Sequence, residues 1–306
     1  MSKFRILCFD GGGIRGLYTA VLLNRIASDV PELLQDIQLY AGTSTGGLLA
    51  LGLASGRSPE NTIQLYLQYG PQIFSRSWWH KIWSLWGLIK AKYDNVALRE
   101  AVATELGEQT MEGLAQQGKH VLISGFELDG VANGYRSWKP KFFHNFPGPT
   151  GDAAELLADV AMRTSAAPTY FPSYQGFVDG GVVANSPTMA ALAQAMDQAT
   201  GNQQLADIRL ISFGTGKLLR FIEGTRNDWG ALQWARPAIP MMLEGSMDVQ
   251  NYECGRILGP SQYHRLAEPL PEPIELDEVE EMDKLVQFAN EVDIEPTVDW
   301  IRMNFL

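Results

Sequence analysis

Ser44 lies between two glycines in the sequence Gly-Thr-Ser-Thr-Gly, residues 42–46. An apolar run at 37–41 precedes this segment and a helical pattern follows it, so a strand, a turn and a helix are expected in that order. In this context the pattern predicts a tight turn that lifts a nucleophilic serine hydroxyl above the sheet edge. Gly42 and Gly46 would leave room for the turn. An ordinary glycine-serine turn fits the same five residues, so both interpretations stay open at this point.

A second glycine cluster, Asp-Gly-Gly-Gly-Ile-Arg-Gly at 10–16, also lies between an apolar run (4–9) and a helical pattern (17–30). In successive glycines, consecutive backbone N–H groups can point into a concave nest that binds anions. The tetrahedral intermediate of ester hydrolysis carries a negative charge and needs such donors. Arg15 either adds positive charge there or holds the loop in place. The dinucleotide fingerprint is the alternative, but Asp29 precedes the second strand instead of ending it, and Asp10 would repel a pyrophosphate.

The proton of a nucleophilic serine needs an acceptor, and the sequence offers a carboxylate in place of a histidine. The four histidines (His80, His120, His144 and His264) lie outside loops rich in small residues. Asp179 ends an apolar run, and Gly180 and Gly181 after it leave room for the carboxylate to face a site. Partial burial would raise its pKa from about 3.9 and make it a better base. Asp-Gly is also common in hairpin turns, so this motif is weak alone.

The three motifs, in this order along the chain, resemble those of the patatin-like phospholipases, and the segment 163–172 (RTSAAPTYFP) is also similar to that family's pattern. The resemblance implies an α/β fold, a three-layer α/β/α sandwich with a mainly parallel central sheet. It further implies lipid acyl hydrolysis by a serine–aspartate pair, without metal or cofactor. By motif, Ser44 is the nucleophile and Asp179 the base. The oxyanion hole is formed by Gly11, Gly12 and Gly13, and the supporting residues are Arg15, Gly42, Gly46, Gly180, Gly181 and Asn185.

Two classes of function remain compatible with this resemblance. One is a lipid acyl hydrolase of the phospholipase A or lysophospholipase type, acting on a phospholipid or another acylglycerol. The other is a storage or regulatory protein whose esterase site is incidental or gated by a partner or ligand. The resemblance covers residues 3–216, so we expect a catalytic domain at 1–216 and a mainly helical, acidic C-terminal extension at 217–306, packed on the same domain.

The composition and the charge indicate which binding partners and which cellular compartment to expect. The net charge is −11, of which −10 falls after residue 267, so the body is nearly neutral and lacks the basic surface that nucleic acid binding requires. The two cysteines, Cys8 and Cys254, indicate no disulfide framework. Without a signal peptide or an apolar run of membrane-spanning length, a cytoplasmic protein is expected. The basic, tryptophan-rich segment 75–93 fits two interpretations. One is peripheral membrane contact through Trp78, Trp79, Trp83 and Trp86, and the other is packing of these rings in the core or in a subunit contact.

Overall fold

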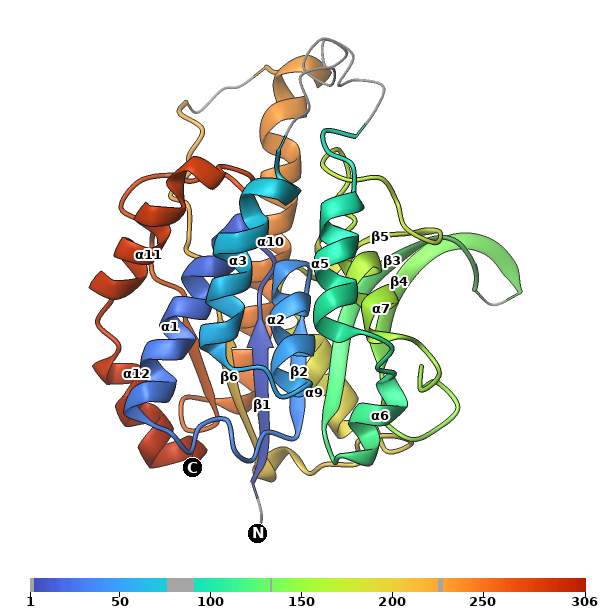
Figure 1. The fold of residues 1–306 in the computed structure, drawn as a ribbon, viewed down its shortest axis with the longest axis vertical. Helices are drawn as coiled ribbons and strands as arrows, with labels where there is room; N and C mark the ends of the chain where they lie inside the picture. The colour runs from blue at the N-terminus through green and yellow to red at the C-terminus, as the bar shows by residue number, and fades with distance from the viewer. Residues whose placement is uncertain (1–2, 76–90, 133, 225–227) are drawn as a thin grey trace.

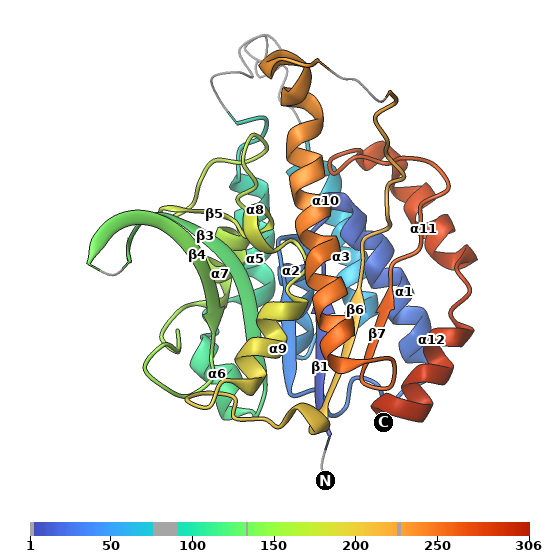
Figure 2. The ribbon, with the colours of Figure 1, turned by 180° about the vertical axis from the view of Figure 1, so that it is seen from behind.

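A mostly parallel β-sheet separates two layers of helices in the computed structural model, which describes residues 3–75, 91–132, 134–224 and 228–306 (Figure 1; Figure 2). Within these residues the sheet has seven strands, in the order β4-β3-β2-β1-β6-β7, with β5 beside β3. The strands β1, β2, β3, β6 and β7 run parallel, whereas β4 and β5 run antiparallel to β3. Their bounds are β1 (Phe4–Phe9), β2 (Leu39–Gly42), β3 (His120–Ala132), β4 (Tyr135–His144), β5 (Phe177–Asp179), β6 (Ile208–Phe213) and β7 (Tyr263–Leu266).

Helices cover both faces of the sheet, as the two opposite views show (Figure 1; Figure 2). The face seen in Figure 1 carries α1 (Gly16–Asp29), α2 (Thr45–Ala54), α3 (Pro59–Ile73), α5 (Val96–Leu106), α6 (Met111–Gln116), α7 (Leu157–Thr164), α11 (Met282–Glu291) and α12 (Glu295–Trp300). The opposite face carries α8 (Gly181–Ala184), α9 (Thr188–Met196) and α10 (Ala231–Leu258). The expected three-layer α/β/α architecture with a mainly parallel sheet is therefore confirmed.

Two hydrophobic cores follow from the alternation of side chains along the central strands. On β1, Leu7 and Phe9 belong to the core under α1 and α2, while Ile6 and Cys8 belong to the core under α9 and α10. All four side chains are fully buried. A strand buried on both faces reads as a continuous apolar run, because successive side chains point to opposite sides of the sheet. This is why the run at 4–9 predicts a central strand.

Two residues, Ser58 before Pro59 and Asp152, are of types that favour helix N-caps, so the sequence predicts that a helix starts at each of them. The structure agrees with the prediction at the first site and differs at the second. Ser58 caps α3 as expected: its side chain accepts a hydrogen bond from the Asn61 N–H at 3.1 Å, and Pro59 occupies the first turn. Asp152 was expected to cap a helix, and that expectation is wrong. Its carboxylate instead binds the Lys141 ammonium at 2.5 Å and the His144 N–H at 3.0 Å, both on β4, and α7 begins only after Leu156.

The sequence motifs meet at the carboxyl edge of the parallel strands. The segment 10–16 follows β1, Ser44 follows β2, residues 214–216 follow β6, and Asp179 ends β5. After β1 the chain builds the sheet toward β2 and β3, and β6 and β7 lie on the other side of β1. Ligands of open α/β sheets bind at this edge, where the direction of strand addition reverses. The topology therefore gathers these motifs around one crevice.

The residues after 216 contribute to the sheet and to both layers. β7 extends the sheet beside β6, α10 packs on α8 and α9, and α11 packs on α1. The chain ends beside β1, where the Arg5 guanidinium donates to the carbonyl oxygens of Phe305 (2.8 Å) and Leu306 (2.9 Å). Within the described residues, no helix is long and apolar enough to cross a membrane. We propose that residues 217–306 fold as one unit with 1–216.

Substitution at the C-terminus tests that proposal. Phe305 is fully buried against the core under α1, so Phe305→Ala should lower the free energy of unfolding by about 3–5 kcal/mol. Urea denaturation followed by circular dichroism measures the change. Met303→Ala is the matched control, because that side chain is 73% exposed in the same turn and should change stability by less than about 0.5 kcal/mol. Equal stabilities of the two variants would contradict the proposal.

Candidate active site

Ser44 lies on a strained turn between β2 and α2. Its backbone has φ 55° and ψ −125°, a conformation that non-glycine residues rarely adopt and that costs roughly 1–3 kcal/mol. The flanking glycines are required by space: a Cβ on Gly42 would lie 2.1 Å from the Gly46 carbonyl oxygen, and one on Gly46 would lie 2.2 Å from that of Phe9. The Ser44 N–H donates to the Thr164 hydroxyl at 2.8 Å, which fixes the turn against α7.

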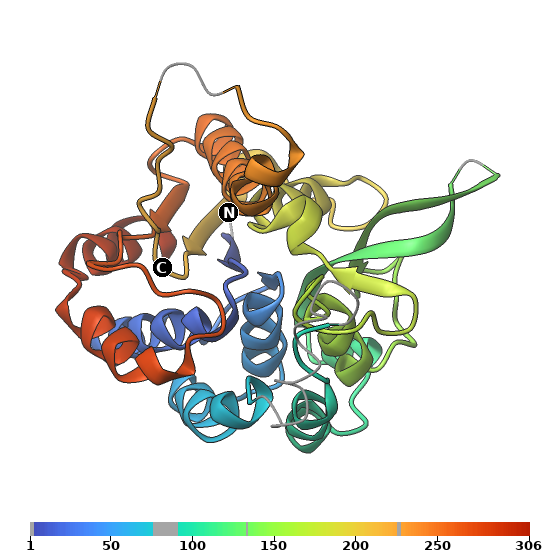
Figure 3. The same ribbon diagram turned by 90° about the horizontal axis from the view of Figure 1, so that it is seen from above.

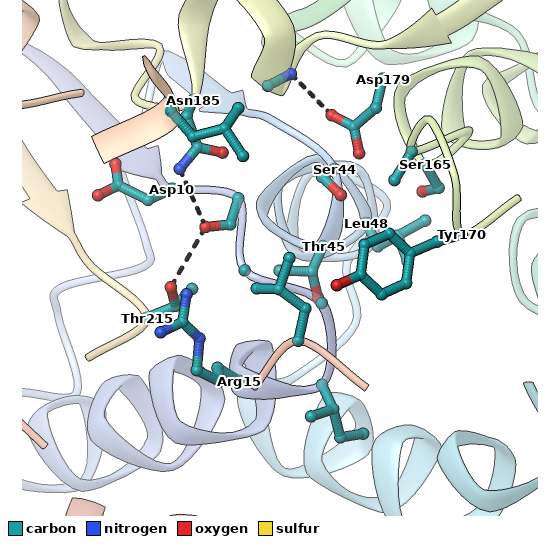
Figure 4. A pocket seen from close by; sticks show the side chains of 18 of the residues that line it. Asp10, Arg15, Ser44, Thr45, Leu48, Ser165, Tyr170, Asp179, Asn185 and Thr215 are labelled. Carbon is teal, nitrogen blue, oxygen red and sulfur yellow. Dashed lines mark hydrogen bonds between the residues drawn. The ribbon is translucent and has the colours of Figure 1, made fainter. Parts of the chain in front are cut away.

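Asp179 faces the same space as Ser44 (Figure 4). It is buried, and burial raises its pKa to about 6, while the Ser44 hydroxyl and the Gly181 N–H lower it. The Gly181 N–H donates to Asp179 Oδ1 at 2.7 Å. Gly180 must lack a side chain, since a Cβ there would lie 2.2 Å from the Ser124 hydroxyl. Among the described residues no cation pairs with this carboxylate, so it is a buried base with a pKa near neutrality.

The glycine loop after β1 presents backbone N–H groups beside Ser44, although not all three that the motif suggests. The Gly11 N–H donates to the Asn185 carbonyl oxygen at 3.0 Å and is therefore occupied. Within the described part of the chain, the N–H groups of Gly12 and Gly13 have no acceptor. A side chain on Gly12 would collide with Thr215, and Gly13 has φ 57°, which favours glycine. The free donors are thus Gly12 and Gly13.

Buried polar contacts hold this loop at the end of β1. The fully buried Asp10 carboxylate pairs with the Arg265 guanidinium of β7 at 2.6 Å. The Thr215 hydroxyl donates to the Gly11 carbonyl oxygen at 3.2 Å, and the Asn185 amide lies 3.4 Å from the same oxygen (Figure 4). Sequence reasoning missed Thr215 and Arg265. The sequence signal for Thr215 was the segment Gly-Thr-Gly-Lys at 214–217. This segment is not a phosphate-binding loop, and it follows β6 at the same edge of the sheet as the motifs after β1 and β2.

Arg15 lies beneath the glycine loop and faces the cavity (Figure 4). Only 9% of the residue is exposed, and burial lowers its pKa to about 10, so it stays charged at neutral pH. Nη1 lies 3.5 Å from the Gly216 carbonyl oxygen, and Nε has no hydrogen-bond partner among the described residues. A buried guanidinium with unused donors adds positive potential to the site.

A cavity of about 850 Å³ opens at Ser44, Asp179 and the glycine loop. Most of its wall is apolar, with side chains from α2, α3, α5 and α10 such as Leu48, Tyr69, Val102 and Leu243. Apart from Arg57, which follows α2, and Glu105 of α5, the charged residues that line it lie toward the glycine loop and the segment after β6. They include Arg15, Lys217, Arg220, Glu244, Asp248 and Glu275. An apolar wall with a few polar groups at one end suits a molecule with a long apolar part.

The alternatives considered from the sequence gain no support from the site. His120 begins β3, His144 ends β4 and the half-buried His264 lies on β7, and none of the three lines the cavity. His80 lies outside the described residues, as do the four tryptophans Trp78, Trp79, Trp83 and Trp86. Asp29 ends α1, about 20 Å along the helix axis from the glycine loop. The described residues contain no cluster of side chains able to hold a metal ion.

Similarity to known proteins shows the family to which this chain belongs. The model of the family "patatin-like phospholipase" matches residues 7–192, more than half of the chain, and the chain belongs to that family. Protein teg of Priestia megaterium is 30% identical over 336 aligned residues that span 100% of both chains. A cGAMP-activated phospholipase of Escherichia coli is 34% identical over 70% of this chain and 62% of its own. The solved structure of the type III effector protein ExoU is 12% identical and has a TM-score of 0.40, covering 97% of this chain and 53% of that one.

The raised pKa of Asp179 predicts a stability that depends on pH. Between the unfolded value of 3.8 and the folded value of about 6, the folded state holds more protons, so stability falls as pH rises through this range. Above pH 6 the buried carboxylate is ionised at a cost, which Asp179→Asn removes. The variant should gain up to about 3 kcal/mol at pH 8, at about 1.4 kcal/mol per pKa unit.

Urea denaturation at pH 8, 6 and 4 measures this gain, which should shrink toward zero at the lowest pH. Asp197→Asn is the control, because that exposed carboxylate has a lowered pKa and should show no gain at pH 8. A gain of Asp179→Asn that is the same at pH 4 and pH 8 would contradict the assigned pKa shift.

Proposed function

We propose that this protein is a lipid acyl hydrolase that cleaves ester bonds through an acyl-serine intermediate, with Ser44 as nucleophile and Asp179 as base. The observation that carries the proposal is the strained, cavity-facing Ser44 beside a buried carboxylate whose pKa is raised to about 6. A base of that pKa is mostly ionised at neutral pH and can still return a proton to a leaving group. Membership of the patatin-like phospholipase family supports the same chemistry.

The reaction would proceed in two balanced halves. Asp179 takes the proton of the Ser44 hydroxyl as the oxygen attacks the ester carbonyl, and the carbonyl oxygen becomes an oxyanion. The tetrahedral intermediate then expels the alcohol, which receives the proton from Asp179, and leaves an acyl-serine. Water, deprotonated by the same carboxylate, attacks the acyl-serine carbonyl, and the second tetrahedral intermediate expels the Ser44 oxygen. That oxygen takes the proton back from Asp179 as the fatty acid is released. Each half returns Asp179 to its ionised form.

Stabilisation of the oxyanion would come from the glycine loop. The N–H groups of Gly12 and Gly13 have no protein acceptor among the described residues, and both glycines line the same cavity as Ser44. Preorganised donors in a cavity with little water stabilise developing charge more strongly than water does. The buried Arg15 guanidinium supports them electrostatically. Asn185 acts through the loop, because its carbonyl oxygen accepts the Gly11 N–H and so fixes how the next two amides point.

The substrate class follows from the cavity wall and its surroundings. A long apolar wall suits an acyl chain, and a phospholipid or another acylglycerol presents one at a lipid surface. Near the cavity, Leu219 and Phe221 expose 72% and 86% of their surface, and Ile239 and Met242 of α10 are also exposed. Exposed apolar side chains around a cavity mouth can insert into the interface of a membrane. We therefore propose peripheral lipid contact through this surface.

The first test removes the nucleophile. Ser44→Ala should lower kcat/KM for a soluble p-nitrophenyl ester by roughly 10³-fold or more, because the acyl-enzyme can no longer form. Labelling by a fluorophosphonate probe should vanish in the same variant. In the wild type, kcat/KM should rise with pH through about 6, as Asp179 ionises.

Two further variants serve as controls for the assignment of the base. Asp179→Asn should be nearly as inactive as Ser44→Ala, whereas His264→Ala should keep most of the activity because that ring lies outside the cavity. Retention of more than a tenth of the activity by Ser44→Ala, or an equal loss in His264→Ala, would refute the serine–aspartate mechanism.

A second test separates lipid contact from chemistry. The double variant Leu219→Ser, Phe221→Ser removes two large exposed side chains that do not line the cavity. Hydrolysis of phosphatidylglycerol vesicles should fall about tenfold or more, since each buried apolar side chain is worth roughly 1.5–3 kcal/mol, and soluble ester hydrolysis should persist. Trp138→Ser is the control, because that 71% exposed ring lies on the β3–β4 hairpin, which projects to one side (Figure 3). Equal vesicle activity of both variants would contradict the proposed surface.

A ligand-gated enzyme is the second candidate, and one observation favours it. The similar Escherichia coli protein is named as a phospholipase activated by cGAMP. The gated hypothesis expects low ester hydrolysis by the purified protein and a strong increase on addition of an activating ligand. Full activity of the protein alone would favour the ungated hydrolase.

A further inference from the structure

The cavity extends from Ser44 along one side of α2. Ser44, Leu48 and Gly52 all line it, at a spacing of four residues. Residues four apart on an α-helix lie above one another on the same face. The cavity therefore follows α2 from the proposed nucleophile into the last turn of this helix.

Two other helices form the remaining walls of this part of the cavity. From α3 the lining residues include Thr62, Leu65, Tyr66, Tyr69 and Ile73, and from α5 they include Leu98, Ala101, Val102 and Leu106. In both sets the residues recur every three or four positions, with Leu65–Tyr66 and Ala101–Val102 as adjacent pairs, so each helix presents one continuous face. The helices α3 and α5 also contact each other, which closes the outer side. The view from above shows α2, α3 and α5 grouped around this part of the molecule (Figure 3). We call the space between these three helices the α2 channel.

The far end of the α2 channel is polar, and a glycine there leaves space that a side chain would occupy. Arg57 and Glu105 line this end and bind each other, with Arg57 Nε 3.4 Å from the carboxylate and Nη2 3.0 Å from the Glu105 carbonyl oxygen. Gly52 lies beside them, and a Cβ built on it meets only the Arg57 Cβ, at 4.0 Å. Glycine is a poor residue inside a helix, so its value here lies in the space it leaves.

We propose that the α2 channel holds the acyl chain of the substrate and that Gly52 sets the chain length the enzyme accepts. This inference rests on the proposed hydrolase function. The eight residues from Ser44 to Gly52 advance about 12 Å along the helix axis. An extended chain of single bonds covers about 3.5 Å in three bonds, so roughly ten bonds span that distance. An acyl chain longer than this must pass Gly52, and the Arg57–Glu105 pair marks where the apolar wall ends.

Gly52→Leu tests the proposal on p-nitrophenyl butanoate, octanoate, dodecanoate and hexadecanoate. The leucine side chain would fill the space that a long chain must cross. We expect kcat/KM for butanoate and octanoate to stay within twofold of the wild type, and kcat/KM for dodecanoate and hexadecanoate to fall at least tenfold. Gly52→Ala should shift the profile in the same direction by a smaller factor. Its methyl group lies at an ordinary contact distance from Arg57, so this variant should fold.

Gly245→Leu is the matched control. Gly245 is a helical glycine in α10 with open space around it, and it does not line the cavity, so its profile should equal that of the wild type. An unchanged profile in both Gly52 variants would overturn the proposal, and so would an equal loss at every chain length in Gly52→Ala, since only long chains reach this position. Retention of activity by Ser44→Ala on the short butanoate ester would instead reject the hydrolase function itself, and failure of the wild type on that ester would reject an ungated hydrolase.

Discussion

The close approach of the Ser44 turn to the end of β1 is the constraint on which the rest of the site depends. Gly46 lies so near the Phe9 carbonyl oxygen that a Cβ would reach within 2.2 Å of it. This contact sets Ser44 beside the glycine loop that leaves β1, and it holds the serine at φ 55°. The strain is tolerated because two buried strands and α2 fix both ends of the turn. Backbone packing, together with the polar contacts of the glycine loop, thereby places the proposed nucleophile and its proposed oxyanion donors.

Two buried carboxylates at this edge of the sheet differ in their partners, because one pairs with a cation and the other does not. Asp10 pairs with Arg265 and ties the glycine loop to β7, so it has a structural role. Asp179 has no such cation among the described residues, and burial raises its pKa to about 6. An unpaired buried carboxylate lowers stability at neutral pH. This unpaired carboxylate is the proposed base, and perturbed pKa values of this kind often occur at functional sites.

The layers of the fold explain why a large apolar cavity can start at a polar edge. The loops that follow the parallel strands carry Ser44, Asp179 and the glycine donors, whereas the helices of one layer carry the apolar wall. The α2 helix belongs to both, because it begins at Ser44 and then lines the cavity with Leu48 and Gly52. The proposed reacting group and the proposed chain site therefore share one rigid element, which makes the distance between them a fixed property of the fold.

The sequence by itself determined the local elements and pointed to the groups now proposed to react. The continuous apolar run at 4–9 indicated a strand buried on both faces, and the glycines around Ser44 indicated its turn, because both depend on neighbours within a few residues. The tertiary structure decided what depends on contacts across the chain. The Gly11 N–H is occupied by Asn185, Arg265 pairs with Asp10, and Asp152 binds β4 instead of capping a helix. Each of these contacts joins positions that the folding of the sheet brings together, and neither partner carries a local signal for the other. The depth of the cavity along α2 likewise required three helices to be placed side by side, which no single stretch of sequence specifies.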